Sequence, residues 1–118
     1  MRWSFMHEAD LVKIKHMYDA ASEILEYTKD KTRKDFESER ILNLSVVHLL
    51  EILGEAAAGV SKEVQTQYKK IPWKSIIAMR NRLIHRYFDI NLDIVWETII
   101  QDIPPLVPNL KEIIDIHN

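Results

Sequence analysis

The sequence contains no cysteine, and only two glycines and four prolines occur among its 118 residues. The lack of cysteine excludes disulfides and thiolate metal sites, and it suits a reducing compartment. Scarce glycine and proline leave long stretches without chain breakers, which favours helices over a turn-rich sheet. The uninterrupted apolar runs are only a few residues long. We therefore expect no signal peptide, no membrane-spanning segment and a cytoplasmic location.

Apolar residues are present in a helical pattern. They recur at intervals of three and four residues along most of the chain, which is typical of amphipathic helices. Helical segments are predicted over about Glu8 to Tyr27, Phe36 to Ala58, Lys62 to Tyr68, Pro72 to Tyr87, Leu92 to Asp102 and Leu106 to Ile116. A chain of this length is expected to form one domain over residues 1–118. The predicted fold class is all-α, an antiparallel up-and-down bundle of four to five helices.

Glycine and proline positions refine this helical prediction. Gly54 lies inside the most apolar predicted helix, where glycine costs ~1 kcal/mol relative to alanine. Such a glycine often marks the close approach of another backbone. Asn91 precedes the segment at Leu92 and is a plausible helix cap. Pro104 and Pro105 are expected to end or kink the helix that precedes them.

Charge is distributed unevenly along the chain. The whole sequence has 16 basic and 18 acidic residues, yet no Asp or Glu occurs between Val64 and Phe88. The basic residues in that segment are Lys69, Lys70, Lys74, Arg80, Arg82 and Arg86. A mildly acidic chain with one cationic segment is expected to engage a polyanion at a single site.

The cationic segment contains an arginine, four residues, a histidine, one residue and a tyrosine, at Arg80, His85 and Tyr87. Arginine keeps its charge and grips phosphate through a planar fork of donors, and histidine can move protons near neutral pH. Helical spacing places Arg80 in an apolar stripe and His85 on the opposite side, toward solvent or a second subunit. A charge at the edge of the core needs a partner, and Glu51 and Glu55 are the candidate carboxylates.

Each motif residue also has a plain structural interpretation. An arginine can serve a structural ion pair, an exposed histidine can lack any catalytic role, and a tyrosine can pack in the core. Other chemistries fit the sequence less well. No Glu-x-x-His spacing precedes any of the five histidines, and neither a glycine-rich phosphate loop nor a nucleophile motif occurs. We therefore expect no metal and no cofactor.

Several segments together resemble the HepT-like branch of the HEPN superfamily. They are residues 51–57 (EILGEAA), 71–74 (IPWK), 79–88 (MRNRLIHRYF), 92–98 (LDIVWET) and 102–106 (DIPPL). The resemblance covers nearly the whole chain. Two positions differ from the usual family pattern: His48 stands where many relatives carry an arginine, and Arg86 where glycine or alanine is common.

This resemblance implies an all-α domain and a homodimer whose arginine–histidine motifs meet at the subunit interface. It also implies a metal-independent endoribonuclease that acts as the toxin of a type VII-like toxin–antitoxin pair. The partner would be a minimal nucleotidyltransferase antitoxin, which in related pairs transfers a nucleotide to the motif tyrosine, here Tyr87.

Roles follow for the residues of the motif. Arg80 would stabilise the charge that develops on the phosphate, and His85 would transfer protons during attack by the RNA 2′-hydroxyl. The residues expected to bind substrate are Lys74, Asn81, Arg82 and Arg86. A two-fold dimer would supply two histidines, so that one could act as base and the other as acid.

Two other functions fit the same residues. A non-catalytic helical binding module could assist a partner nucleotidyltransferase or present substrate to it. A structural dimerisation bundle could pair its cationic helix with acidic surfaces. RNA cleavage in the presence of a chelator would separate the enzyme from the binding module, and strong loss of nucleic-acid binding in Arg82→Ala would count against the structural bundle.

Overall fold

The computed structural model describes residues 6–85 and 90–117, with the side chain of His85 left out. Every regular element in these ranges is helical, so the predicted all-α helical bundle is confirmed. In chain order the elements are α1 (Glu8–Thr28), α2 (Arg33–Ser38), α3 (Arg40–Gly59), α4 (Lys62–Gln67), α5 (Trp73–His85), α6 (Leu92–Glu97), the π-helix η2 (Thr98–Asp102) and α7 (Ile103–His117).

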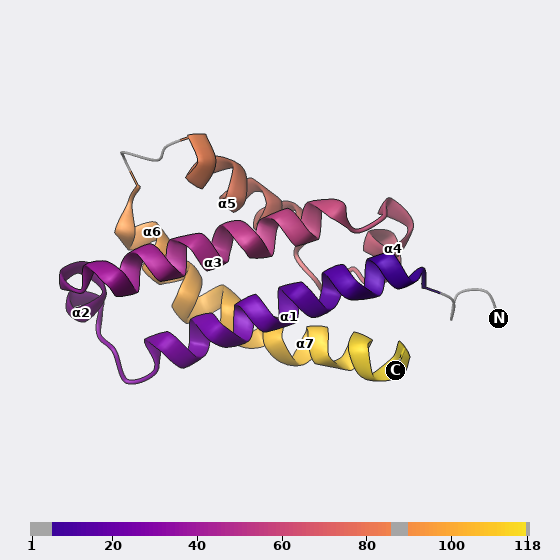
Figure 1. Cartoon of the computed structure of the whole chain (residues 1–118), viewed down its shortest axis with the longest axis horizontal. Helices are drawn as coiled ribbons and strands as arrows, with labels where there is room; N and C mark the ends of the chain where they lie inside the picture. The colour runs from indigo at the N-terminus through magenta and orange to yellow at the C-terminus, as the bar shows by residue number, and fades with distance from the viewer. Residues whose placement is uncertain (1–5, 86–89, 118) are drawn as a thin grey trace.

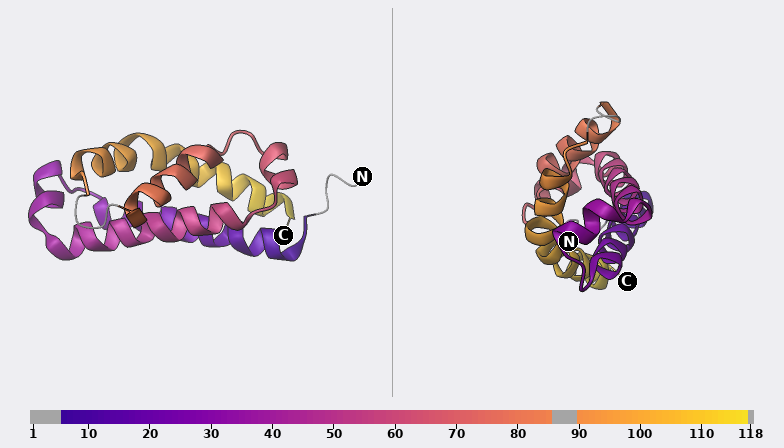
Figure 2. Two further views of the ribbon diagram at one scale, coloured as in Figure 1. Left: turned by 90° about the horizontal axis from the view of Figure 1, so that it is seen from above. Right: turned by 90° about the vertical axis from the view of Figure 1, so that its left-hand side faces the viewer.

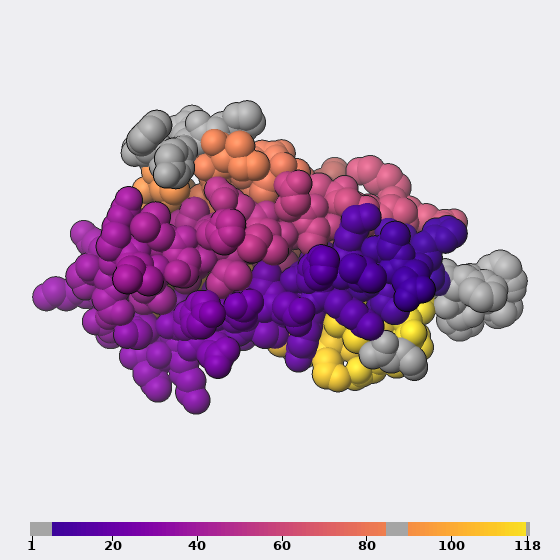
Figure 3. Space-filling view, viewed as in Figure 1, coloured from indigo at the N-terminus to yellow at the C-terminus, as the bar shows by residue number. Residues whose placement is uncertain are grey.

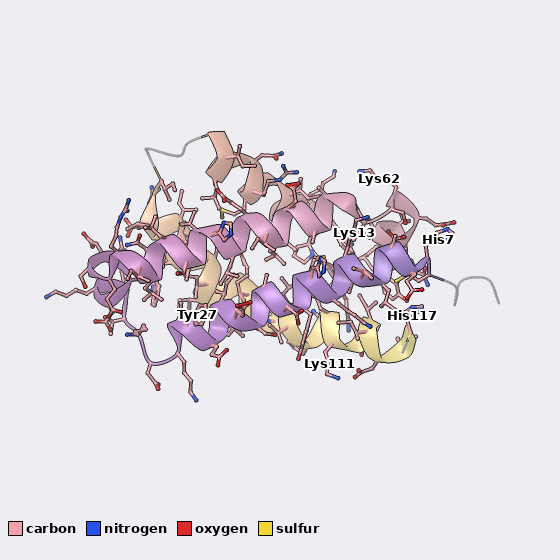
Figure 4. The ribbon with its side chains drawn as sticks, viewed as in Figure 1. His7, Lys13, Tyr27, Lys62, Lys111 and His117 are labelled. Atoms are coloured by element: carbon pink, nitrogen blue, oxygen red, sulfur yellow. The ribbon has the colours of Figure 1, made fainter. Side chains whose placement is uncertain are left out.

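The long helices α1 and α3 lie side by side and run in opposite directions (Figure 1). α7 packs against α1, and α5 packs against α3, so that the helices surround a shared core (Figure 2). His7 and His117 lie at the same end of the molecule, where α1 begins and α7 ends (Figure 4). The main packing contacts of α5 are with α3, and its C-terminal end leans away from the bundle (Figure 1). The packing of α5 on α3 therefore decides where its side chains lie.

The core is apolar and draws on every long helix. Burying a large apolar side chain completely contributes about 1.5–3 kcal/mol. The largest fully buried side chains are Phe36, Ile14, Met17, Ile24, Leu53, Ile71, Ile99, Ile103 and Leu110. Trp73 is also buried, and its indole N–H donates to the Tyr68 carbonyl oxygen at 3.0 Å. That bond anchors the first turn of α5 to the segment that leads into it.

α3 alone among the described helices is long and apolar enough to cross a membrane by length and composition. Half of the tested stretch is buried inside the bundle. Its buried positions face α1 and α5. Such burial is typical of the central helix of a folded domain, which is the position that α3 occupies.

The range Phe36 to Ala58, predicted as one helix, is divided between α2 and α3. Glu39 separates them with an extended backbone, at φ −92° and ψ 94°. A capping box between Thr32 and Asp35 starts α2. Buried Asn43 donates its amide to the Phe36 carbonyl oxygen at 3.0 Å, which satisfies an acceptor at the end of α2. The single-helix prediction was wrong because this buried amide stabilises the break.

Pro104 and Pro105 neither end the C-terminal helix nor open a loop. α6, η2 and α7 follow one another without interruption. The Ile103 N–H bonds to the Thr98 carbonyl oxygen, five residues back, as a π-helix requires. Both prolines then fall in the first turn of α7, where a missing N–H costs little. The expected break is therefore absorbed by one π-helical stretch.

The start of α4 is tied to α1 by a buried carboxylate. Asp10 is only 5% exposed and accepts hydrogen bonds from the Ser61 N–H at 2.9 Å and the Ser61 hydroxyl at 2.8 Å. The Ser61 hydroxyl oxygen accepts from the Val64 N–H at 3.3 Å, as an N-cap does. This contact fixes the start of α4, the helix that precedes α5 in the chain.

Candidate functional site

α5 carries most of the residues singled out from the sequence. Lys74, Asn81 and Arg82 are exposed on it, and Arg80 is partly buried. His85 is the last residue of α5, and its side chain lies outside the described part of the structure. Arg86 and Tyr87 also lie outside the described residues.

Arg80 reaches its position because Gly54 has no side chain. A Cβ built on Gly54 would overlap the Cβ of Arg80 and lie 2.8 Å from its Cγ. The same Cβ would lie 3.2 Å from the Ile76 carbonyl oxygen on the α5 backbone. The close approach predicted from Gly54 is therefore present, and the Arg80 stem occupies it. Gly54 thus sets both the spacing of α3 and α5 and the depth of Arg80.

The guanidinium of Arg80 is held loosely. Its Nη1 lies 3.6 Å from Oε2 of Glu55, a separation that allows ionic attraction but is too long for a good hydrogen bond. The Arg80 side chain is 21% exposed and that of Glu55 is 72% exposed. The Nε of Arg80 is buried and has no hydrogen-bond partner among the described residues. Because part of the Arg80 side chain stays exposed and its pairing with Glu55 is long, the guanidinium can still receive a second anion.

Only one of the two candidate carboxylates pairs with Arg80. Glu55 does so. Oε1 of Glu51 instead lies 3.7 Å from Nδ1 of His48, a residue one turn earlier on α3. His48 is itself well exposed. It also borders a recess of about 430 Å³ lined by Arg40, Asn43, Leu44, Val47, His48, Glu51, Ile90 and Leu92. Nothing in the sequence pattern indicated this grouping, because its members come from two distant segments.

Three exposed polar residues of α5, Lys74, Asn81 and Arg82, lie on one side of the helix. Lys74, Ala78 and Asn81 follow one another at intervals of four and three residues, and Arg82 lies beside them. None of the three polar side chains forms an ion pair with another described residue. Together they present cationic and amide donors to solvent along the same helix as Arg80.

The chemistry of this arrangement is that of an anion site. Within residues 6–85 and 90–117, no three His, Cys, Asp or Glu side chains gather closely enough to hold a metal ion. The donors on α5 are guanidinium, ammonium and amide groups, which suit phosphate oxygens. A half-buried guanidinium with exposed cations along its helix can hold a phosphate near the C-terminal end of α5.

Comparison with known proteins points to ribonucleases. The model of a family described as "Ribonuclease HepT-like" matches residues 17–113. "Putative RNase TTE0752" of Caldanaerobacter subterraneus is 39% identical over 101 residues, which cover 86% of this chain and 90% of the relative. "Probable ribonuclease HepT" of Thermococcus cleftensis is 33% identical over 88 residues, covering 75% of this chain and 80% of the relative.

A third relative carries a further activity in its name. "Gamma-glutamylcyclotransferase and putative RNase MJ0434" of Methanocaldococcus jannaschii is 36% identical over 104 residues, which cover 88% of this chain but only 47% of the relative. This chain therefore spans about half of that protein. No solved structure matches the chain.

Proposed function

Because the chain belongs to the HepT-like ribonuclease family, we propose that it is a metal-independent endoribonuclease that uses Arg80 and His85. The observation that carries this proposal is the guanidinium of Arg80, which is loosely paired with Glu55 and partly exposed. Arg80 lies on the same helix as His85, which supplies a group able to transfer protons.

The proposed reaction begins with attack of an RNA 2′-oxygen on the adjacent phosphorus. His85 takes the 2′-hydroxyl proton, and the bond from phosphorus to the 5′-oxygen of the next nucleotide breaks. That oxygen receives a proton from the corresponding histidine of the second subunit, which leaves a 2′,3′-cyclic phosphate on one product and a 5′-hydroxyl on the other. Arg80 stabilises the negative charge that builds up on the non-bridging oxygens.

The remaining cations of α5 bind the substrate in this proposal. Lys74, Arg82 and Arg86 attract the RNA backbone, and Asn81 orients His85 or donates to the phosphate. Contacts of this kind release counterions, so binding is expected to weaken as salt concentration rises.

The reaction chemistry can be tested on RNA in excess EDTA. We expect the purified protein to cut single-stranded RNA and to leave 2′,3′-cyclic phosphate ends, which mass spectrometry of the products identifies. A matched oligonucleotide with one 2′-deoxy nucleotide should resist cleavage at that position, because the attacking oxygen is missing. Cleavage at the 2′-deoxy position would contradict this mechanism. Absence of any cleavage would favour the non-catalytic binding module.

A second copy of the chain is proposed to cover the outer face of α3. Ile41, Leu44 and Ile52 are 82%, 44% and 38% exposed, and helical spacing places them on one stripe. Ile84 of α5, one turn after Arg80, is 47% exposed. The surface of α3 is open between α1 and α5 (Figure 3). A homodimer formed there would bring two α5 helices, and with them two histidines, to one interface.

Replacing Ile52 by aspartate is expected to separate this dimer, because the substitution places an unpaired charge in an apolar contact. Loss of the second proton-transfer group should lower RNA cleavage by ~10²–10⁴-fold. Light scattering after gel filtration measures the mass, and Ile116→Asp is the matched control because Ile116 is 59% exposed on α7. A dimer that persists in Ile52→Asp places the subunit interface elsewhere.

We further propose that the chain is a cytoplasmic toxin controlled by a minimal nucleotidyltransferase antitoxin. In this scheme the Tyr87 hydroxyl oxygen attacks the α-phosphate of ATP, loses its proton and displaces pyrophosphate. The resulting adenylyl group would block the site through its volume and its negative charge. Intact mass after co-expression with the partner should show one added AMP. Neutralised toxicity with an unchanged mass would indicate inhibition by binding alone.

A further inference from the structure

A second recess lies between α5 and the segment that leads into α6. Its volume is about 380 Å³, within the range of small-ligand sites. The apolar lining residues are Met79, Leu83, Ile90, Ile94 and Val95, and the polar ones are Arg82 and Asn91. Ile94 is 40% exposed, so part of its side chain is available for contact with a ligand. The recess thus offers apolar walls beside two polar side chains.

Among the described residues, the two polar side chains of this recess have only donors left unpaired. Oδ1 of Asn91 already accepts from the Asp93 N–H at 2.9 Å and the Ile94 N–H at 3.3 Å, because Asn91 is the N-cap of α6. Its amide nitrogen is left with two N–H donors. Arg82 has donors alone and forms no ion pair with another described residue. A ligand that fills the recess is therefore expected to combine hydrogen-bond acceptors with an apolar surface.

Arg82 is one of the α5 cations proposed to bind the RNA backbone, so this recess borders the proposed RNA surface, although Arg80, two residues away, points to a different side of the helix. Building on the proposed ribonuclease function, we propose that the recess binds a base of the bound RNA near the cleaved phosphate and prefers guanine to adenine. Guanine presents two adjacent acceptors, N7 and O6, which match the fork of an arginine. Adenine presents N7 beside an amino donor, which would face the donors of Arg82 and Asn91. The two purines otherwise offer the same area for contact with the apolar walls.

The first test compares two RNA oligonucleotides that differ only by guanine or adenine beside a single cleavable position. We expect the wild-type protein to prefer guanine by roughly tenfold in kcat/KM, the size of effect typical of one bidentate arginine–guanine contact. Equilibrium binding of the same oligonucleotides, measured by fluorescence anisotropy, reports the preference without any cleavage step. A ratio near one in both measurements would overturn the proposal.

Two substitutions then probe the donors separately. Arg82→Lys keeps the charge but removes the fork, so the guanine preference should fall toward one. Asn91→Asp keeps the capping oxygen and replaces the donor amide by an acceptor, so the preference should move toward adenine. Arg40→Lys on α3 is the matched control and should leave the ratio unchanged, because Arg40 does not line this recess.

The outcomes separate this inference from the function on which it rests. RNA cleavage with no dependence on Arg82 or Asn91 would remove the base site and leave the ribonuclease intact. No cleavage by the wild-type protein would remove the ribonuclease, and the binding ratio would then decide the base site alone. A change of oligomeric mass in Arg82→Lys without a change in base preference would assign the recess to a protein contact and overturn the proposal.

Discussion

Replacing His85 by alanine is expected to lower RNA cleavage by ~10²–10⁴-fold, the usual contribution of a positioned proton-transfer group. The reason is that the 2′-hydroxyl is a poor nucleophile until its proton is removed. Cleavage of a labelled RNA under single-turnover conditions measures the effect on the chemical step. Circular dichroism should show an unchanged helix content, because His85 is the last residue of α5.

His16→Ala is the matched control for this substitution. His16 is an exposed histidine on α1, a helix whose main packing partners are α3 and α7 rather than α5. The control should therefore cleave RNA at the wild-type rate. If His85→Ala cleaved as fast as this control, His85 would have no part in the reaction, and the proposal would need another proton-transfer group.

Replacing Gly54 by alanine is expected to destabilise the protein and to displace Arg80. Alanine gains about 0.5–1 kcal/mol over glycine inside a helix, but the new methyl group would overlap the Cβ of Arg80. Overpacking of this kind costs about 1–3 kcal/mol, so the net change should be a loss of up to about 2.5 kcal/mol. Urea unfolding measures the stability. RNA cleavage should also fall, since α5 must move outward together with its guanidinium.

Gly59 on the same helix provides the control. A Cβ at Gly59 would meet Cε of Lys13 at 2.8 Å and Cδ at 2.9 Å, and these atoms belong to the flexible end of a side chain. Lys13 lies on α1, close to the end of α3 (Figure 4). Gly59→Ala should therefore cost little stability and leave cleavage unchanged. Equal behaviour of the two alanine variants would show that Gly54 does not position Arg80.

The helical elements were largely predictable because helical periodicity is a local property. The predicted start of α1 at Glu8 and the predicted cap at Asn91 agree with the structure. The division of α2 from α3 was not predictable, since it depends on where the Asn43 amide finds an acceptor. The π-helix before Pro104 was missed for a similar reason: proline forbids certain hydrogen bonds but does not say which alternative the backbone takes.

The candidate site divides in the same way. Spacing along single helices predicted that Arg80 lies at the edge of the core and that Glu51 or Glu55 is its partner. The choice between the two carboxylates came only from the packed structure, which pairs Arg80 with Glu55. The recess beside Arg82 was not predictable from the sequence, because its walls come from both α5 and α6. The amide N–H groups of Asn91 are its unpaired donors only because the Asn91 oxygen caps α6.

The linear order of residues was enough to establish a helical chain with one acid-free cationic segment and the motif at positions 80 to 87. Those features depend on residue type and spacing, which folding does not alter. The depth of Arg80 and its loose pairing with Glu55 were decided by the contact of α5 with α3 at Gly54, and the recess beside Arg82 by the packing of α6 against α5. Periodicity shows which face of a helix is apolar, but only packing determines which residue of the neighbouring helix that face meets.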